Sequence, residues 1–161
     1  MISINKVNFA DPVQSRSLVD VLNAYASDPM GGGEPLSEFA KENLAIELAR
    51  RPTAHAFLAF LNEDPNPVGL AICFEGFSTF ECRPLLNIHD LVVIPSGRRR
   101  GVATSLLFFI ERFAQSINCC KITLEVLEGN HVAKSLYSGA GFAAYELDPQ
   151  VGAAMFWQKA I

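Results

Sequence analysis

The stretch that decides the fold is IHDLVVIPSGRRRGVATSLLFFIERFAQSI, residues 88–117. It predicts an apolar strand, a tight basic turn and then an amphipathic helix with one broad apolar face. The turn places three consecutive arginines, Arg98, Arg99 and Arg100, directly before the small residues Gly101 and Ala103. The first turn of a helix has unpaired N–H groups and carries about half a positive charge. Arginines at such a helix start predict a binding site for phosphate, most naturally for a pyrophosphate.

A second strand follows this helix, because residues 121–127 (KITLEVL) alternate and are rich in β-branched side chains. Strand, helix and strand in this order predict a right-handed βαβ unit with the two strands parallel. The remaining patterns predict strands at 2–7, 54–61, 68–74, 85–94, 142–147 and 153–158, and helices at 18–25, 37–50 and 130–139. Ser37 is the expected N-cap of the second of these helices. Residues 76–80 are expected to be irregular at one end. We therefore predict one α/β domain over residues 1–161, with a mixed, mostly antiparallel sheet of six or seven strands and about four helices.

Composition excludes several classes of function. The net charge of -4 over 161 residues argues against nucleic acid as a partner, because phosphate contacts need a broad basic surface. The N-terminus lacks the apolar core of a signal peptide, and no apolar run approaches the ~18 residues that a membrane span needs. The four cysteines lack metal-ligand spacing. These features predict a reduced, cytoplasmic protein that binds neither a membrane nor a metal.

Two motifs resemble those of a known family. The pattern Arg98-x-x-Gly101-x-Ala103 after an apolar strand resembles the acetyl-CoA signature of the GCN5-related N-acetyltransferases. Residues 130–142, NHVAKSLYSGAGF, resemble that family's second motif, Asn-x-x-Ala-x-x-Leu-Tyr-x-x-x-Gly-Phe. The likeness covers about residues 57–142, and both motifs occur in the family's order and spacing.

The resemblance implies an acyl-CoA N-acyltransferase fold, in which the two parallel strands splay apart and hold the pantetheine arm between them. It also implies acetyl-CoA as cosubstrate and direct transfer of its acetyl group to a primary amine. The residues expected to bind the cosubstrate are Leu91, Val92, Val93, Arg98, Arg99, Arg100, Gly101, Val102, Ala103, Thr104, Asn130 and Ala133. For Asn130, a role as a helix N-cap explains the residue equally well.

Acetyl transfer needs a neutral amine, and a lysine-like amine has a reference pKa of about 10.4. A positioned base is therefore useful, and the candidates are His89 and Asp90. A histidine near its reference pKa of ~6.5 accepts a proton at neutral pH. A structural histidine is the alternative. Strand pleating places His89 and Asp90 on opposite faces unless a bulge intervenes. The resemblance makes Tyr137 the general acid that protonates the departing thiolate, with a packed helix tyrosine as the alternative.

The acceptor is expected to be a small primary amine with an apolar or second cationic part. Aromatic and acidic side chains would line its site. They are Glu34, Glu75, Phe77, Phe80, Asp90 and Glu125. A solvated strand position is the alternative for Glu125. The region around His89 is similar to the diamine acetyltransferases of the spermidine/spermine type, which carry Glu-Asp where this chain has His-Asp.

Two other functions stay open at this point. One is a non-catalytic acyl-CoA-binding module that regulates a partner, and the other is an acetyltransferase for protein lysines or N-termini. The apolar run at residues 153–157 (AAMFW) predicts a homodimer, with a single core strand as the alternative.

Overall fold

The computed structural model describes every residue of the chain except 147, 149 and 151. The elements in order are β1 (Ile2–Lys6), α1 (Pro12–Ala26), the 3-10 turn η1 (Pro29–Gly31), α2 (Glu38–Ala49), β2 (Ala54–Leu61), β3 (Pro67–Ser78), β4 (Arg83–Val93), the 3-10 turn η2 (Pro95–Gly97), α3 (Val102–Ser116), β5 (Ile122–Leu124) and α4 (His131–Gly139). The chain divides into two compact units, a larger one at Met1–Leu124 and a smaller one at Glu125–Ile161. Each is described by itself.

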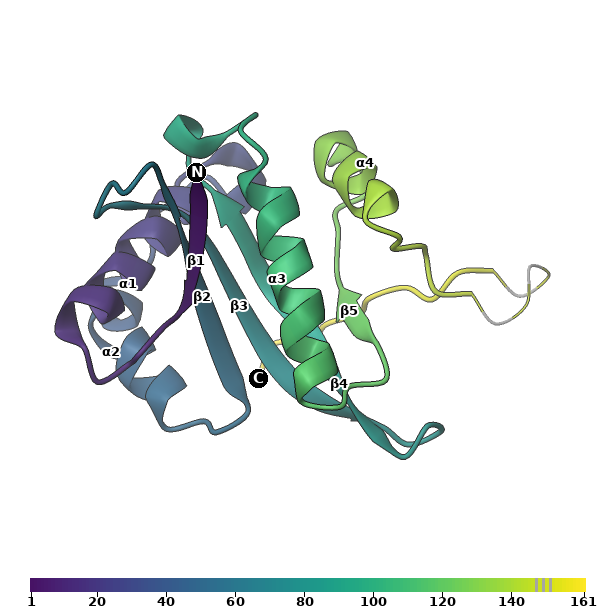
Figure 1. The fold of residues 1–161 in the computed structure, drawn as a ribbon. Helices are drawn as coiled ribbons and strands as arrows, with labels where there is room; N and C mark the ends of the chain where they lie inside the picture. The colour runs from purple at the N-terminus through teal and green to yellow at the C-terminus, as the bar shows by residue number, and fades with distance from the viewer. Residues whose placement is uncertain (147, 149, 151) are drawn as a thin grey trace. The chain divides into compact units, whose positions relative to one another are not determined.

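The larger unit is built on one mixed sheet with the strand order β1-β2-β3-β4-β5 (Figure 1). The first four strands are antiparallel to their neighbours, and β5 pairs parallel to β4. Helix α3 makes the crossover between these two parallel strands, as the βαβ pattern predicts. The predicted α/β class is confirmed.

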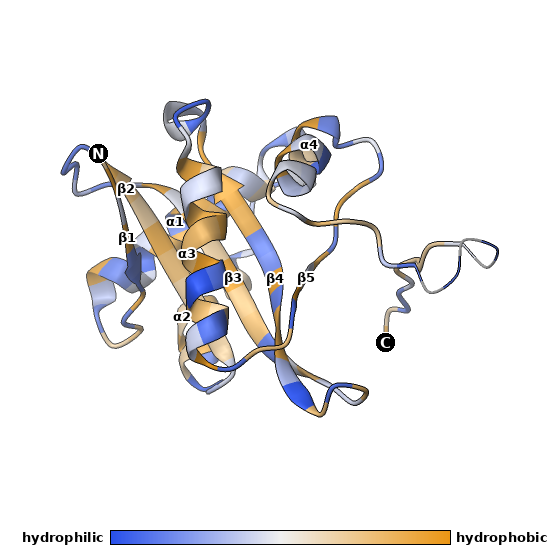
Figure 2. Ribbon diagram, turned by 45° about the vertical axis from the view of Figure 1, so that its right-hand side comes forward, coloured by the Kyte–Doolittle hydropathy of each residue, from blue (hydrophilic) through white to orange (hydrophobic). Residues whose placement is uncertain are grey.

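Helices cover the sheet on both faces. On one face, α1 and α2 pack over a core that includes Leu18, Leu48 and Ile72. On the other face, the Phe57 ring of β2 makes edge contacts with Phe109 and Phe113 of α3, at centroid distances of 5.3 and 5.1 Å. The strands β2 and β3 are accordingly apolar along most of their length, whereas β4 carries hydrophilic stretches (Figure 2).

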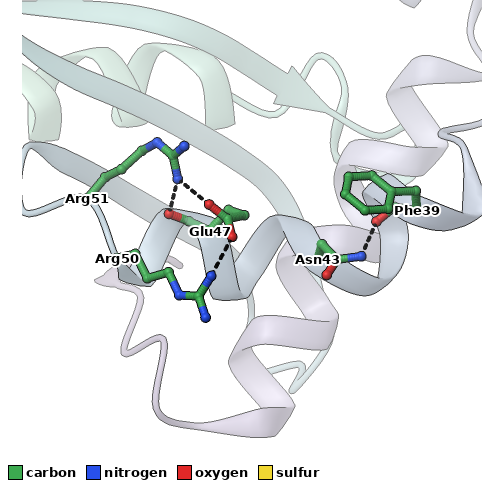
Figure 3. A network of polar contacts seen from close by, with 5 residues as sticks. All are labelled: Phe39, Asn43, Glu47, Arg50 and Arg51. Atoms are coloured by element: carbon green, nitrogen blue, oxygen red, sulfur yellow. Dashed lines mark hydrogen bonds and ion pairs between the residues drawn. The ribbon is translucent and has the colours of Figure 1, made fainter.

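The ends of α2 show how local chemistry sets a helix boundary. The Ser37 hydroxyl accepts a hydrogen bond from the Ala40 N–H at 3.1 Å, so it caps the start as the sequence predicts. Near the C-terminus, Glu47 pairs with both Arg50 and Arg51 at 2.8 Å (Figure 3). These pairs are solvent-exposed and contribute little to stability.

The number of strands differs from the prediction, since the sheet holds five strands in the described part of the chain instead of six or seven. The predicted closing pair, 142–147 and 153–158, is reduced to a single bridge between Glu146 and Ala153, and residue 147 lies outside the described residues. A pair of strands is marginal unless a further layer buries one face. In the smaller unit the apolar side chains of Met155, Phe156 and Trp157 are exposed.

Strand β3 is longer than predicted, because residues 76–78 continue it and pair with the start of β4. The segment is irregular at one end, as predicted, because residues 79–80 form a turn after the strand ends at Ser78. Gly76 lies opposite Leu85, and a Cβ at position 76 would come within 3.1 Å of the Leu85 side chain. The glycine therefore serves close strand packing rather than a turn.

The cysteines differ in accessibility. Cys73 of β3 is fully buried, and burial raises the pKa of its thiol to about 12. Cys82 is exposed, Cys119 and Cys120 are half-buried, and all four are free thiols.

No helix in the described part of the chain is both long and apolar enough to cross a bilayer. The same residues contain no group of three or more His, Cys, Asp or Glu side chains that could hold a metal ion.

Candidate active site

The basic turn between β4 and α3 is a strained and tightly packed loop. A Cβ at Gly97 would lie 2.9 Å from the Val68 side chain, so only glycine fits there. Arg99 has φ 59° and Gly101 has φ 79°, both in the left-handed region. A non-glycine residue in that region costs about 1–3 kcal/mol, and such strain is concentrated at functional sites. Left-handed non-glycine residues also occur at other turns of the chain, so the strain at Arg99 does not by itself mark a site.

The start of α3 has no side-chain cap, and its N-cap residue is Gly101. The other α-helices in the described part of the chain each begin with a capping side chain: Asp11 for α1, Ser37 for α2 and Asn130 for α4. An uncapped first turn leaves backbone N–H groups available to an anion, and the helix dipole favours negative charge there. Such a helix start favours an anion such as phosphate, and the pyrophosphate site at this turn stays a prediction.

Arg98 is held in place by two hydrogen bonds. Its Nη2 donates to Asp28 Oδ2 at 2.7 Å, and its Nε donates to the Val93 carbonyl at 3.1 Å. The Arg98 guanidinium is the main cause that lowers the pKa of Asp28, and the Met30 N–H adds to it. Sequence patterns do not reveal this partner, because the two residues are 70 positions apart.

A register shift in β4 brings His89 and Asp90 together. Ile72 of β3 lies opposite Asp90, and the next residue, Cys73, lies opposite Ile88, so His89 is left without a partner in β3. His89 Nδ1 lies 3.1 Å from Asp90 Oδ2, and the His89 ring makes an edge contact with Phe74 at 5.6 Å. The bulge therefore overrides the simple pleat that would separate the two side chains.

The outer edge of β4 is only partly used by β5. The parallel ladder joins Leu86, Asn87 and Ile88 to residues 122–124 and ends there, although β4 continues to Val93. In the described part of the chain, Leu91–Val93 has no ladder partner on this side. The predicted splay of the two parallel strands agrees with this short ladder.

Tyr25, at the end of α1, is a residue that sequence reasoning missed. Its hydroxyl donates to the Met30 carbonyl at 3.1 Å. Burial raises the pKa of Tyr25, and the negative charges of Asp90 and Asp28 raise it further. Two carboxylates from distant parts of the sequence therefore lie near one phenol.

The other residues predicted to bind the acceptor are dispersed. Glu34 is exposed after η1, and Phe77 and Phe80 are 59% and 92% exposed at the β3–β4 end of the sheet. Glu75 accepts a hydrogen bond of 2.6 Å from His55 Nε2, and the His55 ring packs against Phe113 of α3. Glu75 is thus on the α3 face of the sheet.

The smaller unit carries the second motif. The Asn130 side chain accepts a hydrogen bond from the Ala133 N–H at 3.1 Å and caps α4, so the alternative prediction of an N-cap is confirmed. The Tyr137 ring contacts Phe142 at 6.0 Å and is half-buried. Glu125 lies beyond the end of β5, which the structure places at Leu124 instead of residue 127, so it does not share a strand face with Thr123.

The sequence profile of the acetyltransferase (GNAT) family matches residues 18–142. The chain belongs to the GNAT family. As a member of it, the protein is an acetyltransferase enzyme that transfers acetyl groups to amines.

Named relatives agree with this family. Over 128 residues the protein is 27% identical to a thialysine N-epsilon-acetyltransferase of Caenorhabditis elegans, covering 74% of this chain and 78% of the relative. It is 35% identical over 82 residues to a streptothricin acetyltransferase of Escherichia coli, covering 45% of this chain and 47% of the relative. The fold matches AAC(6')-Iy in complex with the bisubstrate analogue CoA-S-monomethyl-acetylneamine, with a TM-score of 0.75, 18% identity and coverage of 100% of this chain and 99% of that chain.

Proposed function

We propose that this GNAT enzyme transfers the acetyl group of acetyl-CoA directly to a primary amine of a small molecule that carries an apolar or second cationic part. One observation carries the proposal. The uncapped, arginine-flanked start of α3 follows β4, the strand on which the bulge brings His89 and Asp90 together. A site for a pyrophosphate and a candidate base thus come from one continuous segment.

Cosubstrate binding is proposed for the residues of the two motifs. The arginine turn and the first N–H groups of α3 would hold the pyrophosphate, because helix starts and guanidinium groups both favour phosphate. The backbone of Leu91–Val93, which among the described residues has no ladder partner on this edge, would form hydrogen bonds with the amide groups of pantetheine, as it would with an added strand. Asn130 and Ala133 complete the proposed set. A structure of the same fold in complex with a CoA-containing analogue supports this assignment.

The chemistry is a nucleophilic displacement. When bound, acetyl-CoA supplies the thioester; the amine nitrogen forms the new C–N bond while the C–S bond breaks. The His89 imidazole takes the proton that the amine loses, and Asp90 Oδ2, 3.1 Å from Nδ1, stabilises the protonated ring. The Tyr137 hydroxyl gives its proton to the departing thiolate.

The names of two relatives support a small acceptor, since thialysine and streptothricin are the molecules for which they are named. The negative charge at Asp90 supports a cationic acceptor. We also propose that residues 1–161 form one domain, because the family match at 18–142 crosses the boundary between the two units. A cytoplasmic location is part of the same proposal.

The decisive experiment measures CoA thiol release from acetyl-CoA over a panel of mono-amines, diamines, aminoglycosides and peptides with free N-termini or lysines. Turnover on small amines is expected. Turnover only on peptides would indicate a protein acetyltransferase instead, and CoA binding without any turnover would indicate a regulatory module.

The proposed acid has its own test. Tyr137→Phe should lower kcat by about 10-fold or more while CoA affinity stays constant, because the hydroxyl acts on the leaving group alone. Equal turnover would reduce Tyr137 to a packing residue.

The proposed base is tested by pH. For the wild type, log kcat/KM should rise with pH as the general base loses its proton, and the rise should disappear in His89→Gln. A profile that His89→Gln leaves unaltered would assign the proton to Asp90 or to water.

A homodimer is also proposed, from the exposed side chains of Met155, Phe156 and Trp157 in the smaller unit. Sedimentation at micromolar concentration is expected to give twice the chain mass. A species of only 17.6 kDa would contradict it.

A further inference from the structure

Arg98, the first arginine of the proposed pyrophosphate site, already has an anionic partner in this structure. Its Nη2 donates to Asp28 Oδ2 at 2.7 Å, and its side chain is 48% exposed. A guanidinium paired with a carboxylate cannot give the same N–H groups to a phosphate. Asp28 therefore competes with a phosphate for the Nη2 donor and for the positive charge of Arg98.

The loop that presents Asp28 is built around this residue. Asp28 Oδ1 accepts from the Met30 N–H at 3.0 Å, and the Asp28 carbonyl accepts from Gly31 and Gly33 at 2.8 and 3.1 Å. A Cβ at Gly31 would lie 2.0 Å from the Tyr25 carbonyl oxygen, so only glycine allows the loop to close. The position of the carboxylate is thus fixed by several independent contacts.

Asp28 follows α1, the helix whose Tyr25 packs against the core that includes Ile72, and Ile72 lies opposite Asp90 in the β3–β4 ladder. The Asp28 N–H donates to the Tyr25 carbonyl at 2.8 Å, and burial, together with the negative charges of Asp90 and Asp28, raises the pKa of Tyr25. His89, beside Asp90, packs on the ring of Phe74. Two carboxylates next to aromatic rings form a suitable environment for an ammonium group.

We propose that Asp28 is shared between the sites of the two substrates: it pairs with Arg98 until the pyrophosphate of acetyl-CoA takes that arginine, and it then binds a cationic group of the acceptor. This inference rests on the proposed function and adds a specificity-determining residue to it. Acetyl-CoA binding would raise the affinity for a cationic acceptor, and by reciprocity the acceptor would raise the affinity for acetyl-CoA.

The first test is calorimetric titration of CoA alone, without an acceptor. Asp28→Asn keeps an oxygen that can accept from the Met30 N–H but removes the charge that competes for Arg98. CoA should bind this variant about 5-fold more tightly than the wild type, a factor typical of an exposed ion pair. Asp20→Asn, which removes an exposed carboxylate of α1, is the matched control and should leave the affinity unchanged.

Unchanged or weaker CoA binding by Asp28→Asn would overturn the proposal, because the pair would then only hold Arg98 in position for phosphate. The same substitution in an Arg98→Ala background should have no effect on CoA affinity, since the shared arginine is absent. Equal tightening in that background would reduce the effect to long-range charge. A wild-type protein that does not bind CoA would instead refute the proposed function.

The acceptor half is tested with the best amine from the panel and its analogue without the second cationic group. Asp28→Asn should raise KM for the dicationic acceptor by about 10-fold, with kcat nearly constant, and should leave KM for the analogue unchanged. Equal effects on both acceptors would refute the acceptor role. If no amine is acetylated, the acceptor half falls with the proposed function, whereas the CoA titration still decides the competition for Arg98.

Discussion

The starts of α2 and α3 are both helix N-termini, but they are built in opposite ways. At α2 the Ser37 hydroxyl accepts the Ala40 N–H, and the acidic Glu38 stands in the first turn, where it complements the helix dipole. At α3 the N-cap is a glycine with φ 79°, no side chain caps the first turn, and three arginines precede it. One end satisfies one of its donors with its own side chain, whereas the other has no side-chain cap, and among the described residues only the Asp28 carboxylate pairs with Arg98 of its basic turn.

The difference supports the proposed cosubstrate site at the start of α3. A side-chain cap is worth about 0.5–2 kcal/mol relative to alanine, whereas a glycine at the N-cap costs only about a few tenths of a kcal/mol. The left-handed Arg99 adds strain to the same loop. Natural proteins sacrifice local stability in this way mainly where a ligand compensates for it.

The largest expected effect tests the charge of the α3 start. Replacing Arg98, Arg99 and Arg100 together by alanine should weaken CoA binding by about 100-fold or more, because charge-assisted hydrogen bonds contribute ~1.5–3 kcal/mol each. Calorimetry measures the change. The control replaces Arg16, Arg50 and Arg51, which removes the same net charge elsewhere. If both triple variants lose affinity equally, the turn has no specific role.

The next effect concerns the backbone of the same turn. Gly101→Ala should lower the free energy of unfolding by about 1–2 kcal/mol, since alanine resists a left-handed conformation. The nearest atom to a Cβ there, Ile2 Cδ1, is 3.9 Å away, so a steric clash is not the cause. Denaturant unfolding measures the loss. Gly139→Ala, at a helical glycine with open space around it, should be neutral or slightly stabilising. Equal losses would contradict the argument from φ.

A smaller effect is expected at the capped start. Ser37→Ala should cost about 1 kcal/mol of unfolding free energy, because the Ala40 N–H loses its acceptor. CoA affinity should not change. Ser37→Asn, which keeps a capping oxygen, should recover most of the stability. A loss of CoA affinity in Ser37→Ala would remove the contrast between the two helix starts.

The smallest effect depends on pH and tests the cap of α1. The hydrogen bond from the Gln14 side chain, followed by the Val13 N–H, lowers the pKa of Asp11 below its ordinary value near 3.8. A lowered folded-state pKa gives stability that is present above the ordinary value and is lost as the pH falls through the folded value. The free energy of unfolding, measured at several pH values, should be higher for the wild type than for Asp11→Asn near neutral pH, and this difference should shrink in acid. A pH-independent difference would contradict this assignment.

The sequence predicted the parts of the fold that are encoded locally. The periodicity of residues 102–116 and the turn chemistry at 98–101 were enough to place α3 and its basic start, and Ser37 was recognised as a cap. The bulge at His89 could not be predicted, because it arises from the register of β4 against β3. The pairing of Arg98 with Asp28 was equally inaccessible, since a contact between residues so far apart depends on the folded chain. The closing strand pair failed because alternation alone does not supply the layer that a strand pair needs.

The labelling rate of Cys73 can report how often the sheet opens. Its thiol is fully buried in the middle of the sheet and has a pKa of about 12, so a labelling reagent in neutral solution meets almost no thiolate while the sheet is closed. Covalent modification of Cys73 must therefore wait for the strands to separate, whereas the exposed Cys82 reacts at once. The ratio of the two labelling rates reports how often β3 opens in otherwise native conditions. Ligand-induced slowing of that opening can then be measured without an assay for turnover.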